Sequence, residues 1–162
     1  MPPVTSNDRG TVYRHVFAAL VTVAVTTATQ AVEIASRYGV VKALPVSASD
    51  NTFTLAFDGK RLAQIEAESV SLLRVTPHGK QEHIVLERWM PGLHCHKAYM
   101  LLTITQDKKA TVSPSFGECM DLAAVTYLKD GVRIKLRASY DAGAKHPKIT
   151  SFTWAHGQLS GH

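Results

Sequence analysis

The stretch AAVTYLKDGVRIKLRA, residues 123–138, decides the fold class of this chain. Its second half alternates apolar and basic residues, namely Val132, Ile134, Leu136 and Ala138 with Arg133, Lys135 and Arg137. A period of two places the apolar side chains on one face of a β-strand and the basic ones on the other. Asp130-Gly131 is a strong signal for a tight hairpin turn. The stretch therefore predicts a β-hairpin with a buried apolar face and a solvent-facing basic face.

Strand-forming runs of the same kind recur along the chain. Residues 51–57 and 61–67 flank Asp58-Gly59, and further runs cover 70–75, 83–89, 98–105 and 149–154, with a shorter one starting at 110. The run AYMLLTIT, residues 98–105, predicts a central strand buried on both faces. Residues 32–38 and 64–69 could each form a turn of helix, but both are short. We expect a mainly β, single-domain fold of about eight strands, arranged as an antiparallel meander, a sandwich or a barrel-like sheet.

Composition narrows the class of protein further. The chain has 162 residues, of which 45% are hydrophobic and 19% charged. These values argue against a disordered chain and against a membrane protein with several spans. The formal net charge of +5 is basic, but not strongly enough to indicate a nucleic acid partner.

The N-terminal segment has the pattern of a targeting sequence. The run VFAALVTVAVTTA, residues 16–28, is uncharged and follows Arg9, Arg14 and His15. It is shorter than the roughly 20 residues of a membrane span, and it suits the apolar core of a secretory signal peptide. We expect cleavage after Ala31, with Ala28 as the second choice; a buried core helix or an uncleaved anchor is the alternative. Residues 1–31 are thus predicted to be a signal peptide and residues 32–162 the mainly β domain.

This signal predicts a periplasmic protein. The segment has no Arg-Arg pair, which favours the general secretory route over the twin-arginine route. It has no cysteine near the cleavage site, which argues against a lipid anchor. We therefore expect no stable membrane insertion after cleavage.

In an oxidising compartment the two cysteines, Cys95 and Cys119, predict one disulfide. The alternative, a reactive thiol, would need a general base beside it.

The cysteine segments carry a resemblance. Gly92 and Cys95 lie in ERWMPGLHCHKAYMLLTI, residues 87–104, and a Ser-Pro-x-Phe-Gly-x-Cys-x-Asp pattern runs from Ser113 to Asp121. Tyr99 follows the first cysteine, and Trp154 with Gly157 closes the pattern. This arrangement resembles a group of small exported proteins of proteobacteria, except that their Gly-Gly turn is Pro91-Gly92 here. The resemblance implies export, the disulfide and a β fold, and it implies no activity.

Histidines supply one candidate site. His94 and His96 flank Cys95, and on a strand both side chains would point to the same face. Two imidazoles at this spacing can share a Cu²⁺ or Zn²⁺ ion, with His78 or His83 as a third ligand. The alternative is a pair of exposed loop histidines. The ligand spacing is incomplete, so no metal or other cofactor is predicted.

A surface for a protein partner is the second candidate. The loops at 90–97 and 113–120 would be tied together by the disulfide, which lowers the cost of ordering them on binding. Trp89 could be an exposed anchor beside them, although core packing is the default for aromatic residues. The basic face could meet an acidic partner, although it could also be a solvated outer face. The predicted contact residues are Trp89, Met90, His94, His96, Ser115, Phe116, Glu118, Arg133, Lys135 and Arg137.

No catalytic signature accompanies these features. The serines of SPSFG, residues 113–117, lack the G-x-S-x-G elbow of a serine nucleophile. We therefore expect a periplasmic binding protein without catalytic activity, such as an immunity or inhibitor protein that neutralises a toxin or hydrolase acting in the periplasm. The alternative is a small-ligand or metal-binding module that uses His94 and His96. A hydrolytic enzyme with an unrecognised site is the third possibility.

Overall fold

The chain forms a mainly β structure of three antiparallel sheets. The computed structural model describes residues 30–47, 50–75, 79–90, 97–139 and 147–161. Within these ranges there are twelve strands and no α-helix. Each sheet has four strands and takes them from one continuous part of the chain, so every sheet is a meander of neighbouring strands.

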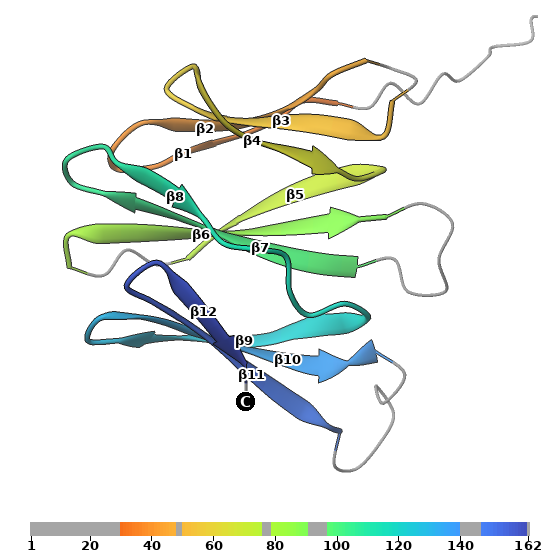
Figure 1. The fold of residues 1–162 in the computed structure, drawn as a ribbon, viewed down its shortest axis with the longest axis vertical. Helices are drawn as coiled ribbons and strands as arrows, with labels where there is room; N and C mark the ends of the chain where they lie inside the picture. Colours follow the sequence, from red (N-terminus) through yellow and green to blue (C-terminus); the bar gives the residue numbers. More distant parts are fainter. Residues whose placement is uncertain (1–29, 48–49, 76–78, 91–96, 140–146, 162) are drawn as a thin grey trace, which may run out of the picture.

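The three sheets follow one another along the sequence (Figure 1). The N-terminal sheet contains β1 (Val32–Ala35), β2 (Val40–Pro45), β3 (Thr52–Phe57) and β4 (Lys60–Glu66). The middle sheet contains β5 (Ser69–Arg74), β6 (Gln81–Trp89), β7 (Lys97–Thr105) and β8 (Ala110–Val112). The C-terminal sheet contains β9 (Met120–Leu128), β10 (Gly131–Ala138), β11 (Ile149–Ala155) and β12 (Gln158–Gly161), in the order β12-β11-β10-β9.

The middle sheet is covered on both faces, as Figure 1 shows. Side chains along a strand alternate between faces. Ile84, Leu86, Leu102 and Ile104 therefore pack in a first core with the N-terminal sheet. Val85, Tyr99 and Leu101 pack in a second core with the C-terminal sheet. This arrangement confirms the prediction that residues 98–105 form a central strand buried on both faces.

The predicted basic hairpin is present, but its turn lies one residue earlier than expected. Gly131 already pairs with Leu128, so Lys129 and Asp130 form the turn. A Cβ atom on Gly131 would overlap the backbone carbonyl of Trp154 in β11. The glycine is therefore needed for the close approach of β10 to β11 rather than for the turn itself.

The predicted count of about eight strands is wrong. The eight predicted runs correspond to β3–β7 and β9–β11, while the short run at 110 corresponds to β8. β1, β2 and β12 were not predicted as strands, and the two candidate turns of helix fall on β1 and on the end of β4. β1 and β12 have four residues each, too few to show a period of two, and they are strands because they pair with β2 and β11. The described residues include no helix that could cross a membrane.

Candidate functional site

The two ends of the middle sheet differ in character. β6 and β7 run antiparallel, so Trp89 pairs with Lys97 at one end and Gln81 pairs with Thr105 at the other. We call the first the Trp89 end; it carries several predicted partner-binding residues. The second end borders a cavity between the middle and C-terminal sheets, which we call the His83 cavity.

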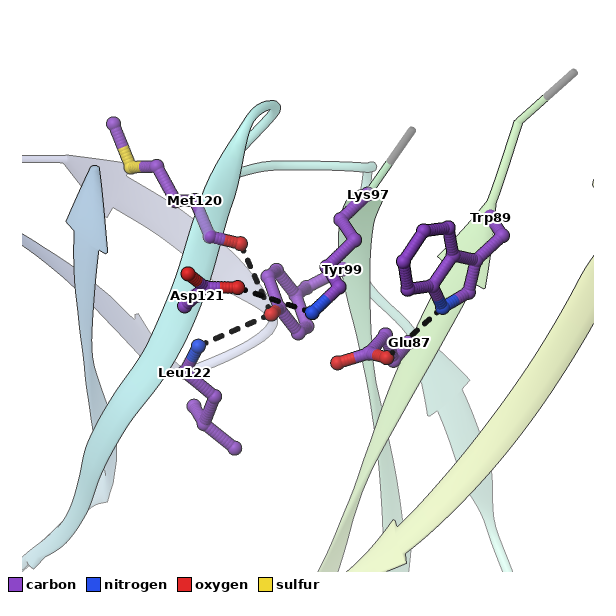
Figure 2. Close-up of polar contacts among 7 residues, drawn as sticks. All are labelled: Glu87, Trp89, Lys97, Tyr99, Met120, Asp121 and Leu122. Carbon is purple, nitrogen blue, oxygen red and sulfur yellow. Dashed lines mark hydrogen bonds and ion pairs between the residues drawn. The ribbon is translucent and has the colours of Figure 1, made fainter. Parts of the chain in front are cut away.

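The indole of Trp89 is held in place although it is partly exposed. Its side chain is 37% exposed, and Nε1 donates a hydrogen bond to Oε1 of Glu87 at 3.2 Å. The Lys97 ammonium lies 4.9 Å from the centre of the indole ring, a cation–π contact. The same ammonium forms an ion pair with Asp121 at 3.0 Å (Figure 2). The exposed indole is therefore fixed by charged neighbours before any partner arrives.

Tyr99 fixes the position of Asp121 relative to Lys97. Its side chain is fully buried, and its hydroxyl donates to the Met120 carbonyl and accepts from the Leu122 amide, both at 3.1 Å (Figure 2). Burial, with the Glu87 charge as a second cause, raises the pKa of Tyr99 above its usual value, so the phenol keeps its proton. Tyr99 thereby ties β7 to the start of β9 and places Asp121 beside Lys97.

Asp121 is an ionised partner in this cluster. Its hydrogen bond with Lys97 lowers the pKa of the carboxyl group below the usual value, and the nearby charges of Lys97 and Arg137 act in the same direction. Asp121 pairs with Arg137 in the register of β9 and β10. The carboxylate therefore links the Trp89 end to the last residue of the basic face.

The loop residues predicted to bind a partner are divided between surface and core. Ser115 and Glu118 are exposed, and Ser115 Oγ accepts a hydrogen bond from Arg88 at 3.1 Å. Met90 is half-buried. Phe116, however, is buried in the second core, where its backbone bonds to Tyr99 in both directions, at 2.8 and 2.9 Å. The prediction that Phe116 contacts a partner is corrected: its backbone pairing directs the ring inward, 5.0 Å from the Phe152 ring centre.

The basic face lies on the outside of the C-terminal sheet. Arg133 and Lys135 are exposed and Arg137 is half-buried, while the residues between them are buried in the second core. Arg133 pairs with Thr126 and Thr153, well along β10 from the residues at the Trp89 end. The structure thus brings Arg137 close to Asp121 but does not gather the whole basic face at the Trp89 end.

The histidine and cysteine predictions fall partly outside the described residues. His94, Cys95 and His96 all lie outside them, so the metal pair and the disulfide stay predictions. His83, one predicted third ligand, pairs with Thr103, and Thr103 lies six residues along β7 from Lys97, about 20 Å at the usual rise of a strand. A metal site shared by His83 with His94 and His96 likewise stays a prediction, because the two other ligands lie outside the described residues. Within the described ranges no group of three metal-binding side chains occurs.

The His83 cavity is the feature that sequence reasoning missed. Its volume is about 600 Å³, and its lining combines residues from both sheets. Its polar and aromatic lining includes His83, Thr103, Tyr127, Trp154, Lys80, Lys109, Lys129 and Asp130. His83 and Thr103 are among the few buried polar residues of the described chain. Thr103 interrupts the apolar run of β7, and this was the one local signal that could have revealed the cavity, because His83 follows two polar residues at the start of β6.

A hydrogen-bonded trio forms the floor of this cavity. Trp154 Nε1 donates to Thr103 Oγ1 at 3.0 Å, and Thr103 Oγ1 lies 2.9 Å from His83 Nδ1. The His83 and Tyr127 ring centres are 5.8 Å apart. Burial lowers the pKa of His83 from 6.5 to about 4, so the imidazole is neutral at neutral pH. The cavity therefore offers neutral hydrogen-bonding groups at its base and charged groups around its opening.

Comparison with protein family models, with curated proteins and with solved structures finds no match for this chain.

Proposed function

We propose that this chain is an exported binding protein without catalytic activity, which holds a protein partner at the Trp89 end. The observation that carries the proposal is the indole of Trp89, which is 37% exposed yet fixed between Glu87 and Lys97. Tryptophan is enriched among the residues that dominate binding energy at protein interfaces. An anchor that is already ordered loses little side-chain entropy on binding.

Charged groups around the indole give this surface a polar rim. Glu87 and Lys97 contact the indole, and Asp121 on β9 forms an ion pair with Lys97. An aromatic centre with a charged surround is the usual anatomy of a protein interface. Because both signs of charge are present, the rim favours one orientation of a complementary partner over others.

The proposed role is that of an immunity or inhibitor protein that neutralises a toxin or hydrolase acting in the periplasm. Export and the Cys95–Cys119 disulfide belong to the same proposal, in keeping with the small exported proteins that the cysteine segments resemble. The Cys119 amide donates to the Lys97 carbonyl at 3.0 Å, so Cys119 lies beside the residue two positions after Cys95. Val32, the first residue expected after cleavage, is also the first residue of β1.

Mass spectrometry of the chain recovered from the periplasm tests export and the disulfide together. The expected mature chain begins at Val32 and gains 2 Da on reduction, the mass of two hydrogen atoms taken up by one S–S bond. A chain that retains residues 1–31, or two thiols that react with an alkylating agent before reduction, contradicts this part of the proposal.

Co-expression tests the partner. The probe is a toxin or hydrolase encoded beside this chain, directed to the periplasm, with cell growth and gel filtration as the two readouts. We expect the wild-type chain to protect cells and to form a complex, and Trp89→Ala to weaken the complex by about tenfold or more. Leu73→Ala is the matched control, since Leu73 is 39% exposed on β5 of the same sheet. Absence of both protection and complex with the wild-type chain would overturn the proposed function.

A second candidate function, the binding of a small ligand, has support from the His83 cavity rather than from His94 and His96. Its volume of about 600 Å³ falls within the range of about 300–1,000 Å³ that is typical of small-molecule sites.

A further inference from the structure

We propose that the His83 cavity binds a small organic anion, in which a carboxylate or phosphate group is attached to an apolar body. This site lies at the opposite end of β6 and β7 from Trp89, and so it is independent of the protein-binding function proposed above. Three features of the lining carry the proposal: a buried imidazole donor, an excess of lysines, and a volume larger than that of a simple ion.

The hydrogen bonds of the trio favour one tautomer of His83. Thr103 Oγ1 accepts the indole proton of Trp154, and a hydroxyl can also donate one proton of its own. His83 Nδ1 lies 2.9 Å from Oγ1, a contact that is compatible with either tautomer. We assign the ring proton to Nε2, since Nδ1 then accepts from the Thr103 hydroxyl, which both donates and accepts within the trio.

This tautomer leaves a donor at the base of the cavity. Nδ1 makes the one hydrogen bond that the described residues provide for His83, although the side chain is only 2% exposed. Nε2 is not among the fully buried polar atoms that lack a partner in the described residues, so this nitrogen is open to the cavity that His83 lines. Water or a ligand with a hydrogen-bond acceptor can therefore take its proton, and the donor is available to a bound ligand.

Lysines make an anionic acceptor the best match. Lys80 precedes β6, Lys109 precedes β8 and Lys129 lies in the turn between β9 and β10, and all three line the cavity. Asp130 is the one acidic residue in the described lining. The balance of fixed charges is therefore positive, which attracts anions and raises their local concentration. Tyr127 adds a phenol that burial keeps protonated, because burial raises its pKa.

The size and the apolar walls of the cavity match a ligand that has an apolar part in addition to its charged group. About 600 Å³ is many times the roughly 30 Å³ that one water molecule occupies in the liquid, so a single inorganic anion would leave most of the space unfilled. Leu128, Trp154 and the stem of Lys129 offer apolar surface on the C-terminal sheet. The matching ligand is an anion whose apolar or aromatic body packs on this surface.

Ring resonances of His83 test the proposal directly. The probes are phenyl phosphate and benzoate, with inorganic phosphate as the free anion and benzylamine as a cation with the same ring. We expect phenyl phosphate or benzoate to shift the Nε2–H signal of His83 saturably, and inorganic phosphate to bind about tenfold or more weakly because it fills less of the cavity. The ratio between phenyl phosphate and benzoate shows which anionic group the site prefers. No saturable shift with either aromatic anion, or equal binding of benzylamine, would overturn the proposal.

A matched pair of variants separates the site from general charge attraction. The double variant Lys80→Gln/Lys129→Gln removes two positive charges at the cavity, and Arg133→Gln/Lys135→Gln removes two from the outer face of the same C-terminal sheet. We expect the first to weaken binding of the preferred aromatic anion by about threefold to tenfold and the second to change it less than twofold, because salt screens distant charges. Equal losses in the two variants would show non-specific attraction and would contradict a site at the His83 cavity.

Discussion

The hydroxyl of Thr103 joins two sheets by accepting the indole proton of Trp154 at 3.0 Å, across 51 residues of sequence. Thr103 belongs to β7 and Trp154 to β11, so the bond crosses the second core. The same hydroxyl lies 2.9 Å from His83 Nδ1 on the neighbouring strand. One threonine thus satisfies an indole and an imidazole in the interior, and the polar groups there depend on one another.

Thr103→Val is expected to destabilise the protein by about 1–3 kcal/mol, since it leaves the buried Trp154 and His83 nitrogens without their partner. Thr153→Val is the matched control, since Thr153 is the residue before Trp154 in β11. The Thr153 hydroxyl is buried and has no hydrogen-bond partner within the described residues, so replacing it with a methyl group is expected to be neutral or stabilising by about 0.5–1 kcal/mol. Urea denaturation with a shared m-value measures both changes. Equal effects of the two variants would contradict the assigned role of the Thr103 hydroxyl.

Stability is expected to fall as the pH drops from 6.5 to about 4. The unfolded chain takes up a proton on His83 near its ordinary pKa of 6.5, whereas the folded chain resists protonation until about pH 4 because the ring is buried. The unfolded state therefore binds more protons within this window, and the free energy of unfolding decreases there by about 1–3 kcal/mol. Urea denaturation between pH 7 and pH 4 measures the loss.

His83→Gln supplies the control for this pH dependence. It removes the titrating ring, so the loss between pH 6.5 and 4 is expected to shrink, while a loss at lower pH remains because Asp121 and Asp58 also have lowered pKa values in the folded state. A direct titration of the His83 ring by NMR is independent of the stability of the variant. A folded-state pKa near 6.5 would contradict the prediction.

Tyr99→Phe is expected to cost about 1–3 kcal/mol, because it removes the buried hydroxyl that the Met120 carbonyl and the Leu122 amide both use. The matched control is Tyr38→Phe. The Tyr38 ring faces the Arg37 guanidinium at 5.5 Å, and its hydroxyl makes no hydrogen bond within the described part of the chain. We expect Tyr38→Phe to change stability by less than about 0.5 kcal/mol. Similar losses for both variants would show that the Tyr99 hydroxyl does not anchor β9.

Period-two alternation made most of the strands predictable. The basic residues of β10 alternate with Ile134 and Leu136, and the continuous apolar run of β7 correctly indicated burial on both faces. Such patterns are local, so they can be read without knowing the neighbouring strand. β1 and β12 became strands through pairing with β2 and β11, and a four-residue segment has too few side chains to show that in advance.

The candidate sites were less predictable because they depend on contacts between distant strands. Trp89 could be proposed as an anchor from its place beside a loop, but its contact with Lys97 results from the pairing of β6 with β7. The loop position of Phe116 predicts a surface residue, whereas in the structure its backbone pairs with Tyr99 and turns the ring inward. The His83 cavity combines hairpins of two different sheets, and the stacking of those sheets has no signal in local sequence.

Gly117 combines two constraints that a single substitution can expose. Its φ of +67° is in the left-handed region, which costs other residues about 1–2 kcal/mol. A Cβ atom there would also overlap Cδ1 of Leu136, a fully buried side chain of the second core. Overpacking of this kind typically costs about 1–3 kcal/mol, so we expect Gly117→Ala to destabilise the protein by about 2–4 kcal/mol.

Gly59→Ala separates the two constraints, because Gly59 has a φ of +78° but a Cβ atom there would meet no atom within 4 Å. We expect this control to lose about 1–2 kcal/mol, which is the backbone cost alone. The additional loss in Gly117→Ala then measures the contact with Leu136. In a double-mutant cycle, Gly117→Ala is expected to cost less in a Leu136→Ala background than in the wild-type chain, because the shorter side chain makes room for the new methyl group. If the two glycine variants lose the same stability in urea denaturation, the loop at Gly117 is not packed against Leu136 and does not fix Phe116 in the second core.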